Sequence, residues 1–203
     1  MNSAEMKAAL DGATILSPPK SKKPKRKPLT IITITAIAGR LNLSQPLDST
    51  VYACLTTTFY SAARLGEFTI PPLKAFGPSQ HIKPSDICWD QDQHGHQVIV
   101  FHLPHTKSSP SGEDVYWSDQ HGPSDPQAAL CNHLTINNPP NDKALFSWRH
   151  PQGLRPLTRT RFLKQINTTA AGNGIIERTW YAYWGNIRIP LTRDTLRHRQ
   201  IHW

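Results

Sequence analysis

The sequence predicts an α+β fold that is mainly helical and carries a small three-stranded antiparallel sheet. Three observations predict it: a helical pattern within residues 48–63, three short strand-like segments between residues 87 and 117, and two helical patterns after them. With 203 residues, 37% of them hydrophobic, and 18 prolines, the chain suits one domain with a modest core and long loops.

The first 28 residues are expected to lie outside that core. Ala4–Leu10 has a short helical pattern, whereas the prolines and lysines of residues 17–28 interrupt any helix and cannot pack a core. Six basic side chains fall within eight residues there: Lys20, Lys22, Lys23, Lys25, Arg26 and Lys27. Such a run indicates a nuclear import signal, an arm that contacts nucleic acid, or a solvated linker.

The first elements of the core are expected in residues 29–63. Residues 29–43 are rich in Ile and Thr, and this composition by itself favours a strand. A helix capped by Asp48 or Ser49 is expected next. Its apolar side chains recur at helical spacing, at Val51, Leu55, Phe59 and Ala62. Arg64 would then lie at the end of the helix, where Gly66 is suited to terminate it.

Strands and two helices follow in the second half of the chain. The predicted strands are Ile87–Trp89, Gln97–Leu103 and Asp114–Trp117, the last two joined by a turn at Ser108–Gly112. The predicted helices are Pro126–Leu134 and Leu157–Ala171, the second capped by Thr158. Trp89, Trp117 and Trp148 are expected to pack in the core or a hairpin.

Charge and cysteine content narrow the class of protein. The net charge of +9 belongs to residues 20–27 and 178–203, because residues 28–177 hold eleven basic and eleven acidic side chains. Three widely spaced cysteines, Cys54, Cys88 and Cys131, favour a reduced intracellular protein over a disulfide framework. We expect no membrane span and no secretion signal, since no apolar run approaches about 20 residues and residues 1–11 contain acidic side chains.

Two basic side chains in distinctive settings suggest phosphate chemistry. Arg64 stands in Ala63-Arg64-Leu65-Gly66-Glu67, and a guanidinium there could hold two phosphate oxygens while Glu67 orients it. Lys107 stands in a polar turn between two strands and could protonate a leaving oxygen. Each also has an ordinary interpretation, as a helix-end ion pair and as a solvent-exposed turn lysine.

Taken in order, these segments resemble the catalytic domain of tyrosine recombinases, the phage-integrase type. The resemblance covers about residues 20–175 and is greatest to the version in Crypton-like mobile elements and related genes of mushroom-forming fungi. It rests on short motifs: Pro24–Pro28, Leu47-Asp48, Ala63–Glu67, Leu103-Pro104, Thr106–Ser108, Gly122-Pro123, Asp125-Pro126 and Leu157-Thr158.

The resemblance implies a helix at residues 29–43, in place of the strand. It implies that Arg64 clamps the scissile phosphate, that Lys107 protonates the leaving 5′-oxygen, and that DNA is the partner, with possible self-association on it. His105, beside Lys107, is a further candidate DNA contact. The implied function is DNA recombination and integration in the nucleus, with no metal, nucleotide or other small-molecule cofactor.

The resemblance also implies parts that this sequence lacks. The family uses an N-terminal helical domain, a His-x-x-Arg pair and a later nucleophilic tyrosine, and no His-x-x-Arg pair follows residue 171. Residues 178–203 contain five arginines, three tryptophans and no lysine, a composition that we attribute to a frameshifted translation. We therefore expect residues 1–28 to be a disordered or helical remnant plus a basic linker, 29–177 a partial catalytic domain without covalent activity, and 178–203 an aberrant tail.

Two other functions fit the sequence: a non-enzymatic nuclear DNA-binding protein that uses the basic arm, and a relic open reading frame without function. A histidine-rich stretch also deserves a metal-site test, because His94, His96, His102 and His105 lie close together in the sequence. Without cysteines at ligand spacing, we interpret them as surface loop residues.

Overall fold

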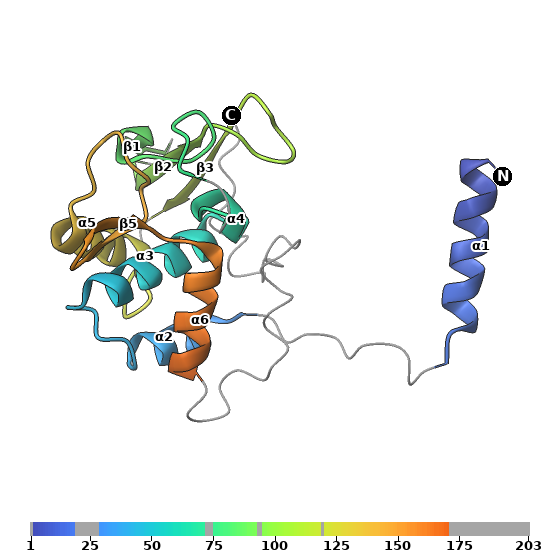
Figure 1. Ribbon diagram of the computed structural model, residues 1–203, viewed down its shortest axis with the longest axis horizontal. Coiled ribbons are helices and arrows are strands. Elements are labelled where there is room, and N and C mark those ends of the chain that lie inside the picture. Colours follow the sequence, from blue (N-terminus) through green and yellow to red (C-terminus); the bar gives the residue numbers. More distant parts are fainter. Residues whose placement is uncertain (1, 19–28, 72–74, 93–94, 119, 171–203) are drawn as a thin grey trace.

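The computed structural model describes residues 2–18, 29–71, 75–92, 95–118 and 120–170 (Figure 1). The described part has the predicted α+β class, with more helix than strand and one three-stranded antiparallel sheet. The basic arm at residues 20–27 and the tail at 178–203 lie outside the described residues.

In chain order the elements are α1 (Ser3–Leu16), α2 (Ile31–Ala38), α3 (Pro46–Tyr60), α4 (Leu65–Phe68), the 3-10 helix η2 (Pro84–Asp86), β1 (Ile87–Gln91), β2 (Gln97–Leu103), β3 (Glu113–Ser118), α5 (Pro126–Asn137), β4 (Ser147–His150), β5 (Gly153–Pro156) and α6 (Arg159–Ala170).

Helix α3 is the centre of the fold, and every residue from Ser49 to Phe59 in it is buried. It packs against α2, α5, α6 and β4, so it has no solvent-facing side. The helix begins earlier than predicted, with Gln45 as N-cap and Pro46 at the first position. Asp48 therefore lies in the first turn, where its carboxylate accepts hydrogen bonds from the backbone of Asn42 and the side chain of Gln165.

Helix α2 forms in a segment whose composition favours a strand, as the family resemblance implied. The Thr30 hydroxyl accepts a hydrogen bond from the Thr33 backbone at 3.2 Å and caps the first turn. Ile34 and Ile37, three residues apart, are buried in the core, whereas Ile32 is exposed. Burial of one face of the helix therefore outweighs the β-propensity of its residues.

The three-stranded sheet follows the predicted segments closely. Its order is β1-β2-β3, with Phe101 of β2 paired to Ile87 on one side and Val115 on the other. Ile99, Phe101 and Leu103 alternate along β2 and point into the core, where Trp117 joins them. Of the two places predicted for Trp89, the core or a hairpin, the structure shows the hairpin: it pairs with Ile99 between β1 and β2 and is 52% exposed.

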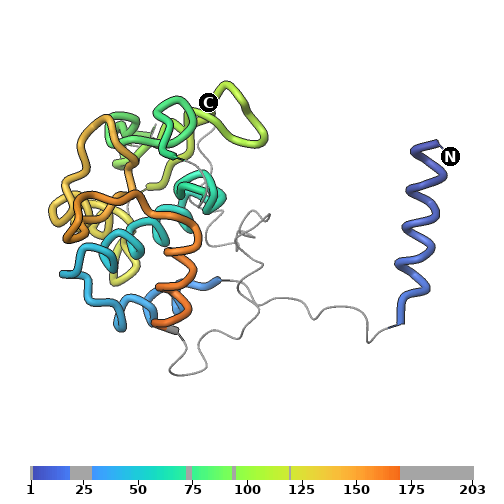
Figure 2. Tube along the Cα trace, in the orientation of Figure 1, coloured from blue at the N-terminus to red at the C-terminus, as the bar shows by residue number. Residues whose placement is uncertain are grey.

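The last elements bring distant parts of the chain together. The hairpin β4–β5 was not predicted. After it, Thr158 pairs with Ile70 in a parallel β-bridge, which places the start of α6 beside α4. Figure 2 shows α6, in orange, descending past α3 from this point. The Thr158 hydroxyl accepts a hydrogen bond from the Arg161 backbone, which confirms its predicted capping role.

Helix α1 buries none of its residues and lies apart from the other elements in Figure 1. Among the described helices, none is both long and apolar enough to cross a membrane.

Candidate functional site

Arg64 lies at a sharp change of chain direction between α3 and α4. Helix α3 ends at Tyr60, and Ala62 then adopts a left-handed conformation with φ of 51°. Arg64 follows in an extended conformation as the N-cap of α4, and Gly66 lies inside that short helix. We predicted that Gly66 would end the helix that precedes Arg64. This prediction was wrong, because the chain leaves that helix by a turn at Ala62.

Glu67 holds Arg64 by two contacts. One carboxylate oxygen of Glu67 accepts the Arg64 backbone N–H at 2.7 Å, and the other lies 3.0 Å from the guanidinium Nη1. The Glu67 side chain is only 10% exposed and that of Arg64 is 30% exposed. Glu67 therefore fixes the Arg64 backbone and one nitrogen of the guanidinium group, while part of the Arg64 side chain stays open to solvent.

The loop between β2 and β3 has a defined shape that positions Lys107. The Thr106 hydroxyl accepts a hydrogen bond from the Ser109 backbone at 2.9 Å, and the Ser109 hydroxyl donates to the Gly112 carbonyl at 2.6 Å. Gly112 has φ of +94°, and a Cβ atom there would lie 2.7 Å from the Leu103 carbonyl oxygen. Glycine is therefore required at this point of the loop.

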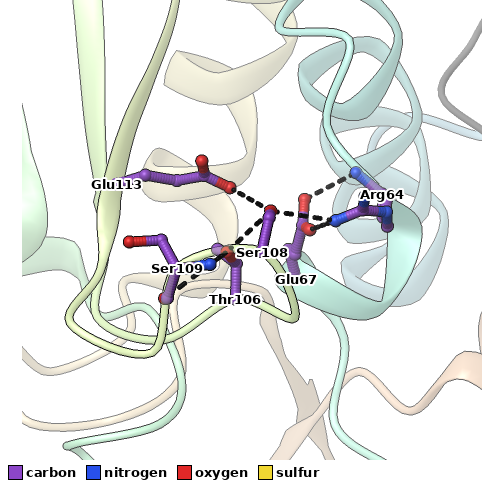
Figure 3. Close-up of polar contacts among 6 residues, drawn as sticks. All are labelled: Arg64, Glu67, Thr106, Ser108, Ser109 and Glu113. Atoms are coloured by element: carbon purple, nitrogen blue, oxygen red, sulfur yellow. Dashed lines mark hydrogen bonds and ion pairs between the residues drawn. The ribbon is translucent and has the colours of Figure 1, made fainter.

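Ser108 connects this loop to α4, as Figure 3 shows. Its hydroxyl accepts a long hydrogen bond from Arg64 Nη1, at 3.5 Å, and donates to Glu113 at 3.3 Å. Ser108 directly follows Lys107 in the chain. Its contact with the Arg64 guanidinium therefore holds the loop that carries Lys107 next to Arg64.

Arg64 and Lys107 line one pocket with a volume of about 340 Å³. Its walls come from α4 and the chain after it, the segment before η2, the β2–β3 loop and the start of α6. The lining residues are Arg64, Gly66, Glu67, Pro71, Gln80, His81, His105, Thr106, Lys107 and Arg159. Three cationic side chains and one carboxylate line the pocket. The pocket therefore favours an anion.

Arg159 is the cationic member that sequence analysis missed. The bridge between Ile70 and Thr158 brings it to the pocket, and its backbone N–H donates to the Ile70 carbonyl at 3.3 Å. Its side-chain Nε is buried and has no hydrogen-bond partner among the described residues. A buried guanidinium nitrogen without a partner is costly unless a ligand or water satisfies it. The sequence offered one signal for Arg159: it directly follows the helix-capping Thr158, so it is placed in the first turn of α6.

Lys107 differs from Arg64 in its surroundings. Its side chain is exposed, and within the described part of the chain it forms no ion pair. His105 also lines the pocket, and its ring Nδ1 lies 3.2 Å from the Pro110 carbonyl. Of the predicted site residues, the structure thus brings Arg64, Glu67, His105 and Lys107 together, whereas the six basic side chains of residues 20–27 lie outside the described residues.

The other histidines have local partners. His96 lies 3.1 Å from Asp92 and His102 lies 2.7 Å from Asp114, while His94 lies outside the described residues. Among the residues that the structure describes, no group of three or more His, Cys, Asp or Glu side chains is arranged to hold a metal ion.

Comparison with protein-family models and with curated proteins finds no match for this chain. Similar solved structures include a Flpe–Holliday junction complex at 13% identity and a TM-score of 0.47, and an FLP recombinase–Holliday junction complex at 14% and 0.46. Each comparison covers 87% of this chain and 42% of the other, so this chain spans less than half their length. A likeness at this level assigns neither family nor function.

Proposed function

We propose that this chain binds DNA and holds one phosphodiester in the pocket between Arg64 and Lys107. The observation that carries this proposal is the convergence of Arg64, Lys107 and Arg159, from three separate parts of the sequence, on one pocket. A phosphodiester carries its charge on two non-bridging oxygens, which a guanidinium can bind in a bidentate manner. Arg64 binds these oxygens, and Glu67 keeps the guanidinium facing the pocket.

The proposed ancestry is the catalytic domain of a tyrosine recombinase from a Crypton-like mobile element. The motif series of the sequence supports it, since Arg64 and Lys107 occupy the places of that family's first arginine and hairpin lysine. In such chemistry Lys107 would protonate the 5′-oxygen that leaves the phosphate. The covalent step of the family needs a tyrosine and a His-x-x-Arg pair, and the proposal includes neither. The proposed activity is non-covalent DNA binding in the nucleus, with self-association on DNA.

The test is the affinity for a short DNA duplex of arbitrary sequence, measured by fluorescence anisotropy over a range of salt concentrations. Lys107→Ala is expected to weaken binding and to lower the slope of log affinity against log salt by about one. The charge-matched control is Lys143→Ala, because Lys143 is exposed, is not among the residues that line the pocket and is paired with Asp142. Equal losses for both variants would overturn the pocket as the binding site.

A second pair of variants separates the pocket from net charge. Arg64→Ala leaves Glu67 buried without its partner, so the double variant Arg64→Ala/Glu67→Gln removes both and keeps the net charge unchanged. The double variant is expected to lose affinity, since the guanidinium itself binds the phosphate. Retained wild-type affinity in a folded double variant would contradict the proposal.

The main alternative is sequence-independent binding through the basic arm, which the run of six cations favours. Deletion of residues 20–27 would then abolish binding, while the Arg64 and Lys107 variants would bind as wild type does. A relic reading frame would instead give no cooperative unfolding transition.

A further inference from the structure

The basic side chains of the described body are unevenly distributed along the sequence. Residues 29–142 hold ten acidic and five basic side chains. Residues 143–170 hold no acidic side chain and six basic ones: Lys143, Arg149, Arg155, Arg159, Arg161 and Lys164. The balanced charge of the body thus conceals a strongly positive segment, which comprises the hairpin β4–β5 and helix α6.

Part of this segment forms one surface, which we call the hairpin patch: Trp148, His150, Arg155 and Arg161. Trp148 and Arg155 are directly opposite in the β4–β5 register, so their side chains share a face. His150 lies on the same face because it is two residues from Trp148. The rings of Trp148 and His150 meet edge to face at 5.1 Å, and the Arg161 guanidinium carbon lies 5.6 Å from the centre of the Trp148 ring.

The structure gives the two arginines of the hairpin patch no carboxylate partner among the residues that it describes. Within the described residues neither Arg155 nor Arg161 forms an ion pair. Arg155 donates to the side chain of Gln152, and the Nε of Arg161 is buried and has no hydrogen-bond partner in the part of the chain that the structure describes. The pKa of His150 is lowered by desolvation and by the charges of Arg155 and Arg161. A bound anion would offset the mutual repulsion of the positive charges on Arg155 and Arg161 and would accept hydrogen bonds from their guanidinium groups.

The hairpin patch and the pocket are adjacent at the first turn of α6. Arg159 lines the pocket, and Arg161, two residues later in α6, stacks on Trp148. Side chains two residues apart on a helix point to different sides. The first turn of α6 therefore offers one arginine to the pocket and one to the patch, at a separation that a short length of DNA backbone can span.

We infer that the hairpin patch is a second contact surface for DNA, where Arg155 and Arg161 bind backbone phosphates next to the one held in the pocket. The choice of DNA as ligand rests on the proposed function. The stacked Trp148 ring keeps the Arg161 guanidinium in place without neutralising its charge. The patch makes no base-specific contact, so its contribution is independent of DNA sequence.

The experiment compares two double variants that each remove two positive charges from residues 143–170. Arg155→Gln/Arg161→Gln removes the patch. Lys143→Gln/Arg149→Gln is the control, because Lys143 precedes the hairpin and Arg149 projects from its other face, where Nε donates to the Asn137 carbonyl. With a short DNA duplex, the patch variant is expected to lower the salt slope of binding by roughly 1.8, two phosphate contacts, and the control by much less.

Equal changes in the two double variants, or no change in the patch variant, would overturn the inference. Thermal melts establish that each variant is folded. Should Arg161→Gln disturb the packing on Trp148, the single change Arg155→Glu, with Arg149→Glu as control, gives the same test. Loss of binding in the patch variant alone, with Lys107→Ala and Arg64→Ala/Glu67→Gln at wild-type affinity, would refute the pocket and leave the patch standing. The reverse pattern would refute the patch alone.

Discussion

Two clusters of polar side chains in this protein are built in opposite ways. In the first, between α3 and α5, His133 lies fully buried with all its hydrogen bonds made. Its Nε2 lies 3.0 Å from the Leu145 carbonyl and donates to it, and its Nδ1 lies 3.1 Å from both Thr50 and Asn137. In the second, the pocket, Arg64, Lys107 and Arg159 line an open space.

The difference between the two clusters distinguishes polar side chains that stabilise the fold from polar side chains that can bind a ligand. A buried polar group that is fully hydrogen-bonded specifies packing and has no capacity left for a ligand. Cations that outnumber the carboxylates around them keep hydrogen-bond donors available for an anion. Changes in the His133 cluster should therefore alter stability, whereas changes at the pocket cations should alter binding. Four predictions, from the largest effect to the smallest, test this contrast.

Acid should weaken the fold through His133. Burial lowers the pKa of His133 from 6.5 to about 4, so the folded protein holds this histidine neutral where the unfolded chain protonates it. The unfolded state then binds more protons, and stability falls as pH decreases from about 6.5 to about 4, by about 3 kcal/mol in all. Denaturant unfolding at a series of pH values measures this loss. A His133→Gln variant should lack this part of the pH dependence, and an identical pH profile in both proteins would contradict the assignment.

The loop that carries Lys107 should tolerate no side chain at Gly112. Gly112→Ala combines a positive φ with a Cβ atom 2.7 Å from a backbone oxygen, which is expected to destabilise the fold by about 2 kcal/mol. Gly66→Ala is the matched control on the other wall of the pocket, since no heavy atom lies within 4 Å of its Cβ position. Denaturant midpoints should fall for the first variant and stay level or rise for the second. Equal midpoints would show that the loop adapts.

Glu67→Gln should have a smaller effect on stability. It removes the ion pair with Arg64, which is partly exposed, and weakens the contact to the Arg64 backbone. The expected loss is about 1 kcal/mol, measured by thermal or denaturant unfolding. A loss of several kcal/mol would place this pair with the His133 cluster, as part of the structural core.

Lys107→Ala should leave the stability unchanged to within about 0.5 kcal/mol, because the side chain is exposed and makes no ion pair with described residues. Its effect is expected in DNA binding alone. A clear drop in the melting temperature would mean that Lys107 stabilises the loop and would remove the contrast between the two clusters.

The sequence by itself determined the elements whose local pattern and local chemistry agree. The strands β1 to β3 are short runs of β-branched and aromatic side chains bounded by turn residues, and α6 starts after a threonine that caps it. For these segments the interactions that decide the structure lie within a few residues. Arg64, Glu67 and Lys107 could likewise be singled out because two short motifs contain them, and His105 because it lies beside Lys107; the structure brings all four to one pocket.

Only the tertiary structure decided what depends on contacts between distant residues. Residues 31–38 are helical because Ile34 and Ile37 reach the core, against their β-propensity. Arg64 opens α4 instead of ending α3, since the chain turns at Ala62. Arg159 reaches the pocket through the bridge between Ile70 and Thr158, 88 residues apart. Local patterns cannot encode such pairings, because their free energy comes from burial and hydrogen bonds that exist only once the chain has closed on itself.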